Sequence, residues 1–293
     1  MDVTEIGVLV AVGPEGIGDG ALEVAATEAR RLGVGIELLH VAHTQVVTVP
    51  TRDEHELALG RAHAQVGHHV LADAVERLEA LVEGHVPITS EIVDGHVART
   101  IVERGTATRL IVLEAREIGP MGRLVTRSVS TNVAAHAHVP VLVVPRAWTS
   151  AVGADLPITL GIDEPLDVKH EAPAALELAR ATGRPLVVLH AAWIAEPYQG
   201  VAFVGYPMKQ WLEDAYHELD TALAGMVTEG DVVTCDVHWA RPVDALVRAT
   251  QRSSLLVLSR RPATRPLAPH LGPVTRAVLH HAECPVLVAD REQ

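Results

Sequence analysis

The glycines that follow the first apolar run of the chain have a spacing that could do chemistry. Gly16, Gly18 and Ala21 match the G-x-G-x-x-G/A pattern of turns that approach the pyrophosphate of a dinucleotide. A dinucleotide site also needs an Asp or Glu at the end of the second strand to hold the ribose, but that strand ends in LHV at residues 39–41. We therefore interpret the glycine run as a strand-to-helix turn that needs flexible residues, and not as a cofactor site.

Other catalytic and metal-binding motifs are incomplete. His-Glu occurs at residues 55–56 and 217–218. Leu59 and Thr221 stand where the zinc hydrolase motif H-E-x-x-H requires its second histidine. The sequence contains neither a G-x-S-x-G elbow nor a G-x-x-x-x-G-K-[ST] loop. Neighbouring residues on a helix point about 100° apart, so paired histidines rarely share a metal. We therefore expect no catalytic residue and no metal site, although His68-His69, His136-x-His138 and His280-His281 are paired. His136 and His281 correspond in the internal repeat, and we assign them packing or capping roles.

Charge and composition exclude several classes of protein. The net charge of −13 disfavours nucleic acid and anionic membranes as partners, because both require clustered positive charge. Cys235 and Cys284 offer no metal-ligand spacing and suit a reducing compartment. The chain starts with Asp2 and Glu5 where a signal peptide needs positive charge, and no apolar stretch approaches the roughly 18 residues of a membrane span. We expect a cytoplasmic protein.

The chain contains an internal repeat. HAHVPVLVV at residues 136–144 and HAECPVLVA at residues 281–289 agree at six of nine positions, with a shift of 145 residues. Earlier in each half the shift is 150 residues, which pairs ELLHVAH at 37–43 with VVLHAAW at 187–193. Residues 145–156 lack periodicity and hold Pro, Gly and Ser, as in a linker. We place one domain at 1–147 and a second at 155–293.

Each half alternates short apolar runs with longer segments of helical period. Val66, Val70, Ala74, Leu78 and Val82 recur every four residues and predict one long helix with an apolar stripe. Five strands alternating with helices predict an α/β domain with a five-stranded parallel sheet flanked by helices, twice over. The expected strands are 6–12, 36–42, 86–93, 109–113 and 140–144 in the first half, and 157–163, 185–191, 232–238, 254–258 and 285–289 in the second.

The short first strand, the terminal HAxxPVLVV block and the tandem arrangement resemble the universal stress proteins, in the two-domain form common in actinobacteria. The resemblance covers nearly the whole chain. It implies two Rossmann-like domains of the adenine nucleotide alpha hydrolase-like type. Many members bind ATP through an Asp at the end of the first strand and a loop of the form G-x-x-G-(nine residues)-G-[ST]. Glycines in such a loop allow backbone N–H groups to approach phosphates closely.

The first half has lost this motif. Its three glycine positions fall on Glu114, Glu117 and Arg127, and its Asp position falls on Gly13. Carboxylates facing a triphosphate repel it, although arginines could offset part of that repulsion. We expect no ordinary ATP site in this half; the arginines concerned are Arg116, Arg123 and Arg127.

The second half keeps more of the motif. Asp163 ends its first strand and Gly272 stands at the last glycine, whereas Ser259 and Pro262 replace the first two glycines. Pro273 replaces the Ser/Thr and removes a hydroxyl and an N–H, although Gly-Pro is a good helix start. Nearby arginines could contact phosphate instead or belong to a solvated loop. The candidate nucleotide-binding residues are Asp163, His190, Ser259, Arg260, Arg261, Arg265, Gly272, Val274 and Thr275.

Aromatic residues are concentrated in one segment of the second half. Residues 1–147 contain no Phe, Trp or Tyr, whereas six of the eight aromatic residues lie between 193 and 216. This segment follows a strand end that borders the ligand crevice of an open α/β sheet, so it could form a lid over a flat ligand. The alternative is a packed loop or a subunit contact. The residues are Trp193, Tyr198, Phe203, Tyr206, Trp211 and Tyr216.

The resemblance and these departures predict a non-catalytic, regulatory stress-response protein that binds ATP or ADP, if at all, in the second domain only. The alternative is a nucleotide-independent dimeric scaffold that acts through an unknown protein partner. Weak ATP hydrolysis stays open as a third reading. The apolar terminal strands PVLVV and PVLVA could pair within one chain, as a pseudo-dimer, or between the chains of a homodimer.

Overall fold

Runs of Val, Leu and Ile form parallel strands in both halves of the chain. In the computed structural model the chain divides into two units, Met1–Ser150 and Ala151–Gln293, which we call unit 1 and unit 2. The structure describes residues 5–42, 54–115, 129–153, 155–194, 206–260 and 271–290; for 54–63 and 152 this covers the backbone only. In the described part of the chain, no helix is long and apolar enough to cross a membrane.

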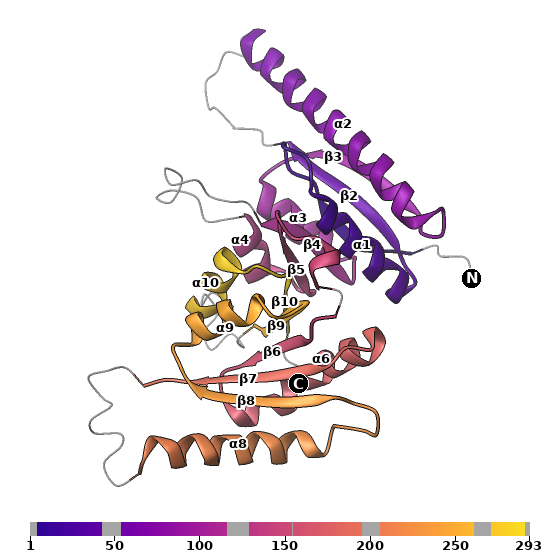
Figure 1. Ribbon diagram of the computed structural model, residues 1–293. Helices are drawn as coiled ribbons and strands as arrows, with labels where there is room; N and C mark the ends of the chain where they lie inside the picture. The colour runs from indigo at the N-terminus through magenta and orange to yellow at the C-terminus, as the bar shows by residue number, and fades with distance from the viewer. Residues whose placement is uncertain are drawn as a thin grey trace. The chain divides into compact units, whose positions relative to one another are not determined.

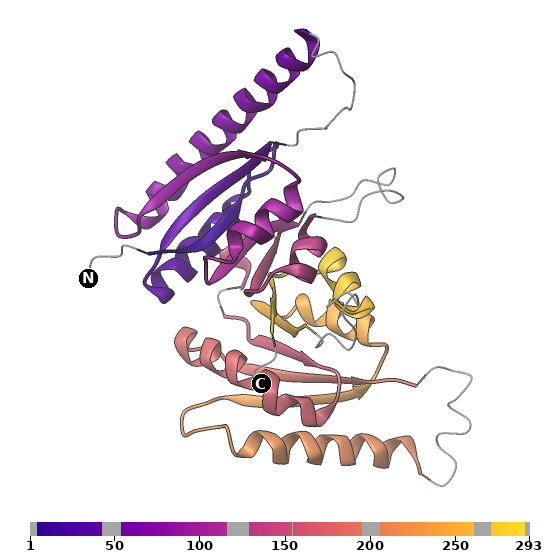
Figure 2. The same ribbon diagram turned by 180° about the vertical axis from the view of Figure 1, so that it is seen from behind.

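Unit 1 is a five-stranded parallel sheet in the order β3-β2-β1-β4-β5. Helices α1 and α2 pack together on one face of the sheet, and α3 and α4 on the other (Figures 1 and 2). The central strands are buried on both faces, which explains their continuous apolar sequences. The elements are β1 Ile6–Ala11, α1 Asp19–Leu32, β2 Gly35–Ala42, α2 Glu54–Val82, β3 Ile88–Asp94, α3 Val97–Gly105, β4 Leu110–Ala115, α4 Val129–His136 and β5 Val141–Pro145. The short helix α5, Ser150–Gly153, begins at the last residue of unit 1 and continues into unit 2.

The long helix α2 carries the predicted apolar stripe, with one exception. Val70, Ala74, Leu78 and Val82 are buried, but Val66 is 41% exposed. Figure 1 shows that the N-terminal part of α2 extends beyond the ends of β2 and β3. Gly67, the next residue, faces the sheet instead, since a Cβ there would lie 2.7 Å from His40 Cδ2. A spacing of exactly four residues drifts around a helix of about 3.6 residues per turn, so it does not follow one face over the whole helix.

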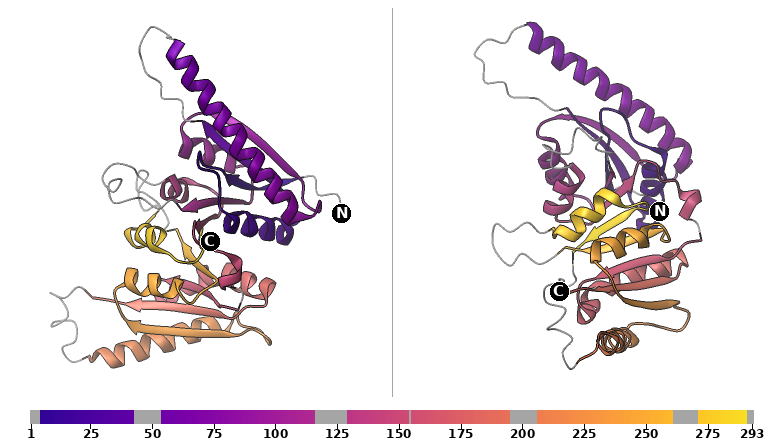
Figure 3. Two further views of the ribbon diagram at one scale, coloured as in Figure 1. Left: turned by 45° about the horizontal axis from the view of Figure 1, so that its top comes forward. Right: turned by 60° about the vertical axis from the view of Figure 1, so that its left-hand side comes forward.

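Unit 2 repeats this architecture with the strand order β8-β7-β6-β9-β10. Helices α6 and α8 pack on one face and α9 and α10 on the other; α8 lies against β8 in the views of Figure 3. The elements are β6 Ile158–Ile162, the 3-10 turn η1 Pro165–Asp167, α6 Val168–Thr182, β7 Leu186–Ala192, α8 Met208–Ala224, β8 Val233–Trp239, α9 Pro242–Thr250, β9 Leu255–Ser259, α10 Pro273–His281 and β10 Val286–Ala289.

The two predicted sheets are confirmed, and every predicted strand overlaps an observed one to within two residues at each end. The repeat extends to the helix ends. Helices α1 and α6 both stop at a left-handed glycine, Gly33 with φ 66° and Gly183 with φ 67°, which are 150 residues apart. Glycine adopts this conformation without a Cβ penalty, so the same sequence signal ends the same helix in both units.

An ion pair at the amino-terminal edge of the unit 2 sheet joins α6 to the loop before β8. Arg180 donates to both carboxylate oxygens of Asp231, at 2.9 Å from Nε and 2.6 Å from Nη2. The Arg180 guanidinium and the hydrogen bonds from Thr228 hold the pKa of the Asp231 carboxyl well below its ordinary value of 3.8. Asp231 therefore stabilises the folded state in its ionised form.

We predict that Asp231→Asn lowers the thermal midpoint of unit 2 at pH 7. Because the folded pKa is depressed, the contribution of Asp231 is complete above pH 3.8 and is lost as the pH falls through the folded value. The difference in midpoint between the variant and the wild type should therefore shrink below pH 3.8. Glu229→Gln is the control, since this exposed neighbour forms no ion pair within the described residues. A constant difference at all pH values would contradict this account.

Candidate functional site

The carboxyl edge of the unit 2 sheet holds a pocket between β6 and β9. The strand order reverses at this point, because the chain leaves β6 toward α6 on one face and leaves β9 toward α10 on the other. Loops that part in this way leave a crevice at the strand ends, which is where open α/β sheets bind ligands. The pocket encloses about 100 Å³ and is lined by Gly161, Ile162, Asp163, Glu171, Leu189, Ala191, Pro242, Leu246, Leu258, Ser259, Gly272, Pro273, Val274 and Thr275.

Five of the nine candidate residues named from the sequence line this single pocket. Asp163 lines it from the position directly after β6 and is exposed. Ser259 comes from the end of β9, and the other three come from the start of α10. The five are Asp163, Ser259, Gly272, Val274 and Thr275, whereas Arg261 and Arg265 lie outside the described residues.

Arg260 lies beside the pocket but is engaged with a carboxylate. Its side chain is only 3% exposed, and Nη1 donates to Asp290 Oδ1 at 3.0 Å. Its backbone N–H donates to the carbonyl of Ala289 at 2.8 Å, which ties the ends of β9 and β10 together. A phosphate that approached the guanidinium would have to compete with Asp290.

His190 faces away from the pocket. Leu189 and Ala191 line the pocket, and successive side chains of a strand alternate between the two faces of the sheet. Burial lowers the pKa of His190, against the opposing charge of Glu164, so the imidazole is neutral. Its repeat partner His40 donates from Nδ1 to the carbonyl of Val12 at 2.9 Å, whereas His190 Nδ1 forms no hydrogen bond within the described structure.

The start of α10 supplies backbone donors to the pocket. Gly272 is the N-cap, with extended backbone angles of φ −68° and ψ 163°, and Pro273 occupies the first helical position. Proline fits there because the first N–H groups of a helix have no intrahelical partner. The next N–H groups of the helix are those of Val274 and Thr275. They lie in the first turn, where a backbone N–H can donate to an acceptor outside the helix.

The sequence reasoning missed several residues of the pocket wall, among them Glu171 and Gly161. Glu171, in the first turn of α6, is only 4% exposed although it carries a carboxyl group. Gly161 is also part of the wall, since a Cβ there would lie 2.5 Å from Leu246 Cδ2. The spacing of Glu171 matches no motif, so the sequence alone does not single it out. Its burial becomes visible only once the fold of the sheet and its helices is known.

In unit 1 a side chain of the chain itself lies at the corresponding strand ends. Glu114, which lies 145 residues before Ser259, ends β4 with a side chain that is 9% exposed. Its Oε1 accepts a hydrogen bond from the backbone N–H of Gly18 at 2.8 Å, and its Oε2 pairs with Arg146 at 3.2 Å. Gly18 is the N-cap of α1, where an anion is favoured. The related positions Glu117, Arg127, Arg116 and Arg123 lie outside the described residues.

The glycines of the dinucleotide pattern have packing and turn roles. Gly16 has φ 80°, and its N–H donates to the carbonyl of Gly13 at 3.0 Å, which closes a tight turn. A Cβ on Gly18 would lie 2.5 Å from Glu114 Oε1, and one on Gly20 would lie 2.2 Å from the backbone oxygen of Trp148. The interpretation of this run as turn chemistry agrees with the structure, which adds close packing as a second reason for the glycines.

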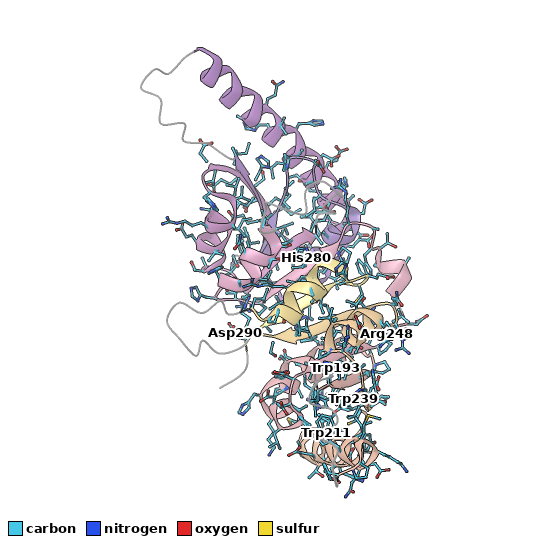
Figure 4. All side chains as sticks on the ribbon, turned by 90° about the vertical axis from the view of Figure 1, so that its left-hand side faces the viewer. Trp193, Trp211, Trp239, Arg248, His280 and Asp290 are labelled. Carbon is cyan, nitrogen blue, oxygen red and sulfur yellow. The ribbon has the colours of Figure 1, made fainter. Side chains whose placement is uncertain are left out.

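Three tryptophans form a packed cluster in unit 2. The rings of Trp193 and Trp239 are 5.6 Å apart, and those of Trp211 and Trp239 are 5.5 Å apart in an edge-to-face arrangement (Figure 4). The Arg241 guanidinium lies 5.2 Å from the centre of the Trp193 ring. The cluster joins the end of β7, the start of α8 and the end of β8. Within the aromatic segment Tyr206 bonds to Asp214, whereas Tyr198 and Phe203 lie outside the described residues.

Comparison with known proteins decides the family. A model of the universal stress protein family matches residues 7–145 and again residues 157–290. The chain belongs to the universal stress protein family. Universal stress protein Rv1996 of Mycobacterium tuberculosis is 28% identical over 98% of this chain and 95% of its own length. A universal stress protein of Mycolicibacterium smegmatis is also 28% identical, over 97% of both chains.

Solved structures agree with the tandem fold. The crystal structure of a universal stress protein from Archaeoglobus fulgidus aligns with a TM-score of 0.69 at 15% sequence identity and covers 97% of both chains. At this identity the likeness concerns the fold. The family assignment and the two-domain α/β architecture expected from the sequence are therefore confirmed, in a family whose mycobacterial members match this chain over nearly its whole length.

We predict that Gly20→Ala lowers the free energy of unfolding of unit 1 by about 1–3 kcal/mol, because the new methyl group must displace a backbone carbonyl in a packed region. Gly225→Ala is the control. Gly225 has φ −78°, and a Cβ added to it would meet no neighbour within 4 Å, so its substitution should be neutral or stabilise by about 0.4–1 kcal/mol. Urea unfolding followed by circular dichroism measures both. Equal effects would contradict the packing role of Gly20.

Proposed function

We propose that this universal stress protein is a non-catalytic regulator that binds one adenine nucleotide or nucleoside per chain, in unit 2. The observation that carries the proposal is the difference between two equivalent crevices. In unit 2 the crevice is a pocket lined by five of the nine candidate residues, and in unit 1 Glu114 reaches from the end of β4 to the N-cap of α1. The family resemblance is the reason for choosing adenine.

The chemistry of the unit 2 pocket supports a binding role. Asp163 has oxygen acceptors for hydroxyl groups, Ser259 and Thr275 have hydroxyls, and the first turn of α10 contributes backbone N–H groups. Apolar walls complete the pocket, as is usual for small-molecule sites. In the part of the chain that the structure covers, no group of three His, Cys, Asp or Glu residues could hold a metal ion.

A second candidate is a scaffold that works without nucleotide, as a homodimer or through an intrachain pseudo-dimer. The pairing of Arg260 with Asp290 and the loss of an N–H at Pro273 favour it, because both remove groups that could hold phosphate. The tryptophan cluster then serves as the packed base of a partner surface. Ligand binding distinguishes the two candidates.

The test is to purify the protein without added nucleotide, denature it, assay the small molecules released, and then titrate adenine compounds by calorimetry. We expect about one equivalent per chain at saturation, lost in Asp163→Ala and in Gly272→Val. Ser259→Glu should also abolish binding, because it introduces into unit 2 the side chain that fills the unit 1 crevice. Glu15→Ala, in the corresponding loop of unit 1, is the control and should bind normally.

Absence of both bound nucleotide and binding heat would favour the scaffold. Phosphate release from ATP that is lost in Asp163→Ala would instead show an enzyme and contradict the non-catalytic role. The Ser259→Glu variant needs a check by circular dichroism, so that loss of binding is not confused with loss of fold.

A further inference from the structure

One acidic side chain lies on the otherwise apolar buried face of α6. Glu171 is only 4% exposed and borders the pocket of unit 2. Burial of a carboxyl group costs free energy unless hydrogen bonds or charges compensate for it. An apolar side chain would carry no such cost, so the presence of Glu171 needs a reason other than packing. The remaining buried residues of this helix are Val168, Ala172, Ala175, Leu176, Leu178 and Ala179.

The architecture does not require an acid at this position. The shift of 150 residues that relates Gly33 to Gly183 also relates Ala21 in α1 to Glu171 in α6. Ala21 is 1% exposed, so the same position is buried in both units. Unit 1 therefore builds the same helix and sheet with a methyl group here. A residue that departs from the packing pattern in one copy of a repeat, and lines a pocket there, is typical of a functional site.

The position of Glu171 in its helix favours the ionised form. This residue lies in the first turn of α6, where the helix dipole stabilises negative charge. An ionised carboxylate accepts hydrogen bonds and cannot donate them, so it selects N–H and O–H groups of a ligand. Ile162, Leu189 and Leu258 give the same pocket apolar walls, and surroundings of low dielectric strengthen a hydrogen bond.

We infer that Glu171 determines the specificity of unit 2, because its carboxylate accepts a hydrogen bond from the 6-amino group or a ribose hydroxyl of a bound adenine compound. This inference rests on the proposed function, since it concerns the same pocket. It adds a residue that the family motif does not contain, whereas Asp163 belongs to that motif. A site built to bond an N–H or O–H group rejects analogues that lack this group.

The experiment is calorimetric titration of the full chain and of Glu171→Ala. The ligand is adenosine or ATP, whichever binds the wild type more tightly, together with its purine, 2′-deoxy and 3′-deoxy analogues. The purine analogue lacks the 6-amino group, and each deoxy analogue lacks one hydroxyl. We expect one analogue to bind the wild type at least about tenfold more weakly than its parent, because a hydrogen bond to a charged group is lost. In Glu171→Ala this ratio should fall to about one, and the analogue affected identifies the group that Glu171 binds.

Two further variants separate this role from a structural one. Glu171→Gln keeps the shape and one acceptor oxygen but not the charge, so its ratio should lie between those of the wild type and Glu171→Ala. Glu177→Ala, on the exposed face of α6, is the matched control and should keep the wild-type ratio. The thermal midpoint of ligand-free Glu171→Ala should equal or exceed that of the wild type, because a buried carboxyl group is removed.

A ratio that stays at the wild-type value in both Glu171 variants would overturn the inference and leave the proposed function standing. Equal binding of all three analogues and their parent to the wild type would do the same. A lower thermal midpoint of Glu171→Ala would also overturn it, because Glu171 would then serve the fold. Binding of neither adenosine nor ATP would overturn both proposals.

Discussion

A parallel sheet whose strand order reverses between two neighbouring strands must leave a crevice where their loops part. In this chain the reversal falls between β1 and β4 in unit 1 and between β6 and β9 in unit 2. Buried backbone groups at such an edge need hydrogen-bond partners, and the adjacent helix start adds unpaired N–H groups. Side chains of the unit itself, a bound molecule or water can supply these partners.

The two units solve this problem differently. In unit 1, Glu114 accepts from the N-cap amide of α1 and pairs with Arg146. A hydrogen bond of this kind, with one charged partner, contributes about 1.5–3 kcal/mol. In unit 2 the equivalent position is Ser259, whose short side chain leaves the pocket open. The Arg–carboxylate pair of unit 2 is formed by other residues, Arg260 and Asp290. The exchange of Glu for Ser accounts for the functional difference that we propose between otherwise similar units.

Much of the fold could be predicted because its signals are local. Apolar runs, helical periodicity and left-handed glycines act over a few residues, and the repeat gives each signal twice. The role of the glycine run was also predictable in part, since the absence of an acidic residue after the second strand argued against a dinucleotide. The exposure of Val66 was missed, because a spacing of exactly four residues drifts around a helix of about 3.6 residues per turn.

The site was harder to predict because its contacts join distant parts of the chain. Gly18 and Glu114 are 96 residues apart, and no motif links them. Glu114 looked like a group that repels phosphate, whereas in the structure it replaces the anion. Trp239 lay outside the aromatic segment seen in the sequence, although it completes the cluster with Trp193 and Trp211. Arg260 was a candidate phosphate ligand until the structure placed Asp290 beside it.

Closure of one crevice by Glu114, with the other left open to a ligand, is the feature on which the proposed function depends. The most direct measurement is a crystal structure of the full chain grown with adenosine. The account predicts ligand density between the ends of β6 and β9 and the start of α10, with Glu114 still bonded to Gly18. Ligand density in the crevice of unit 1, with Glu114 displaced, would contradict it.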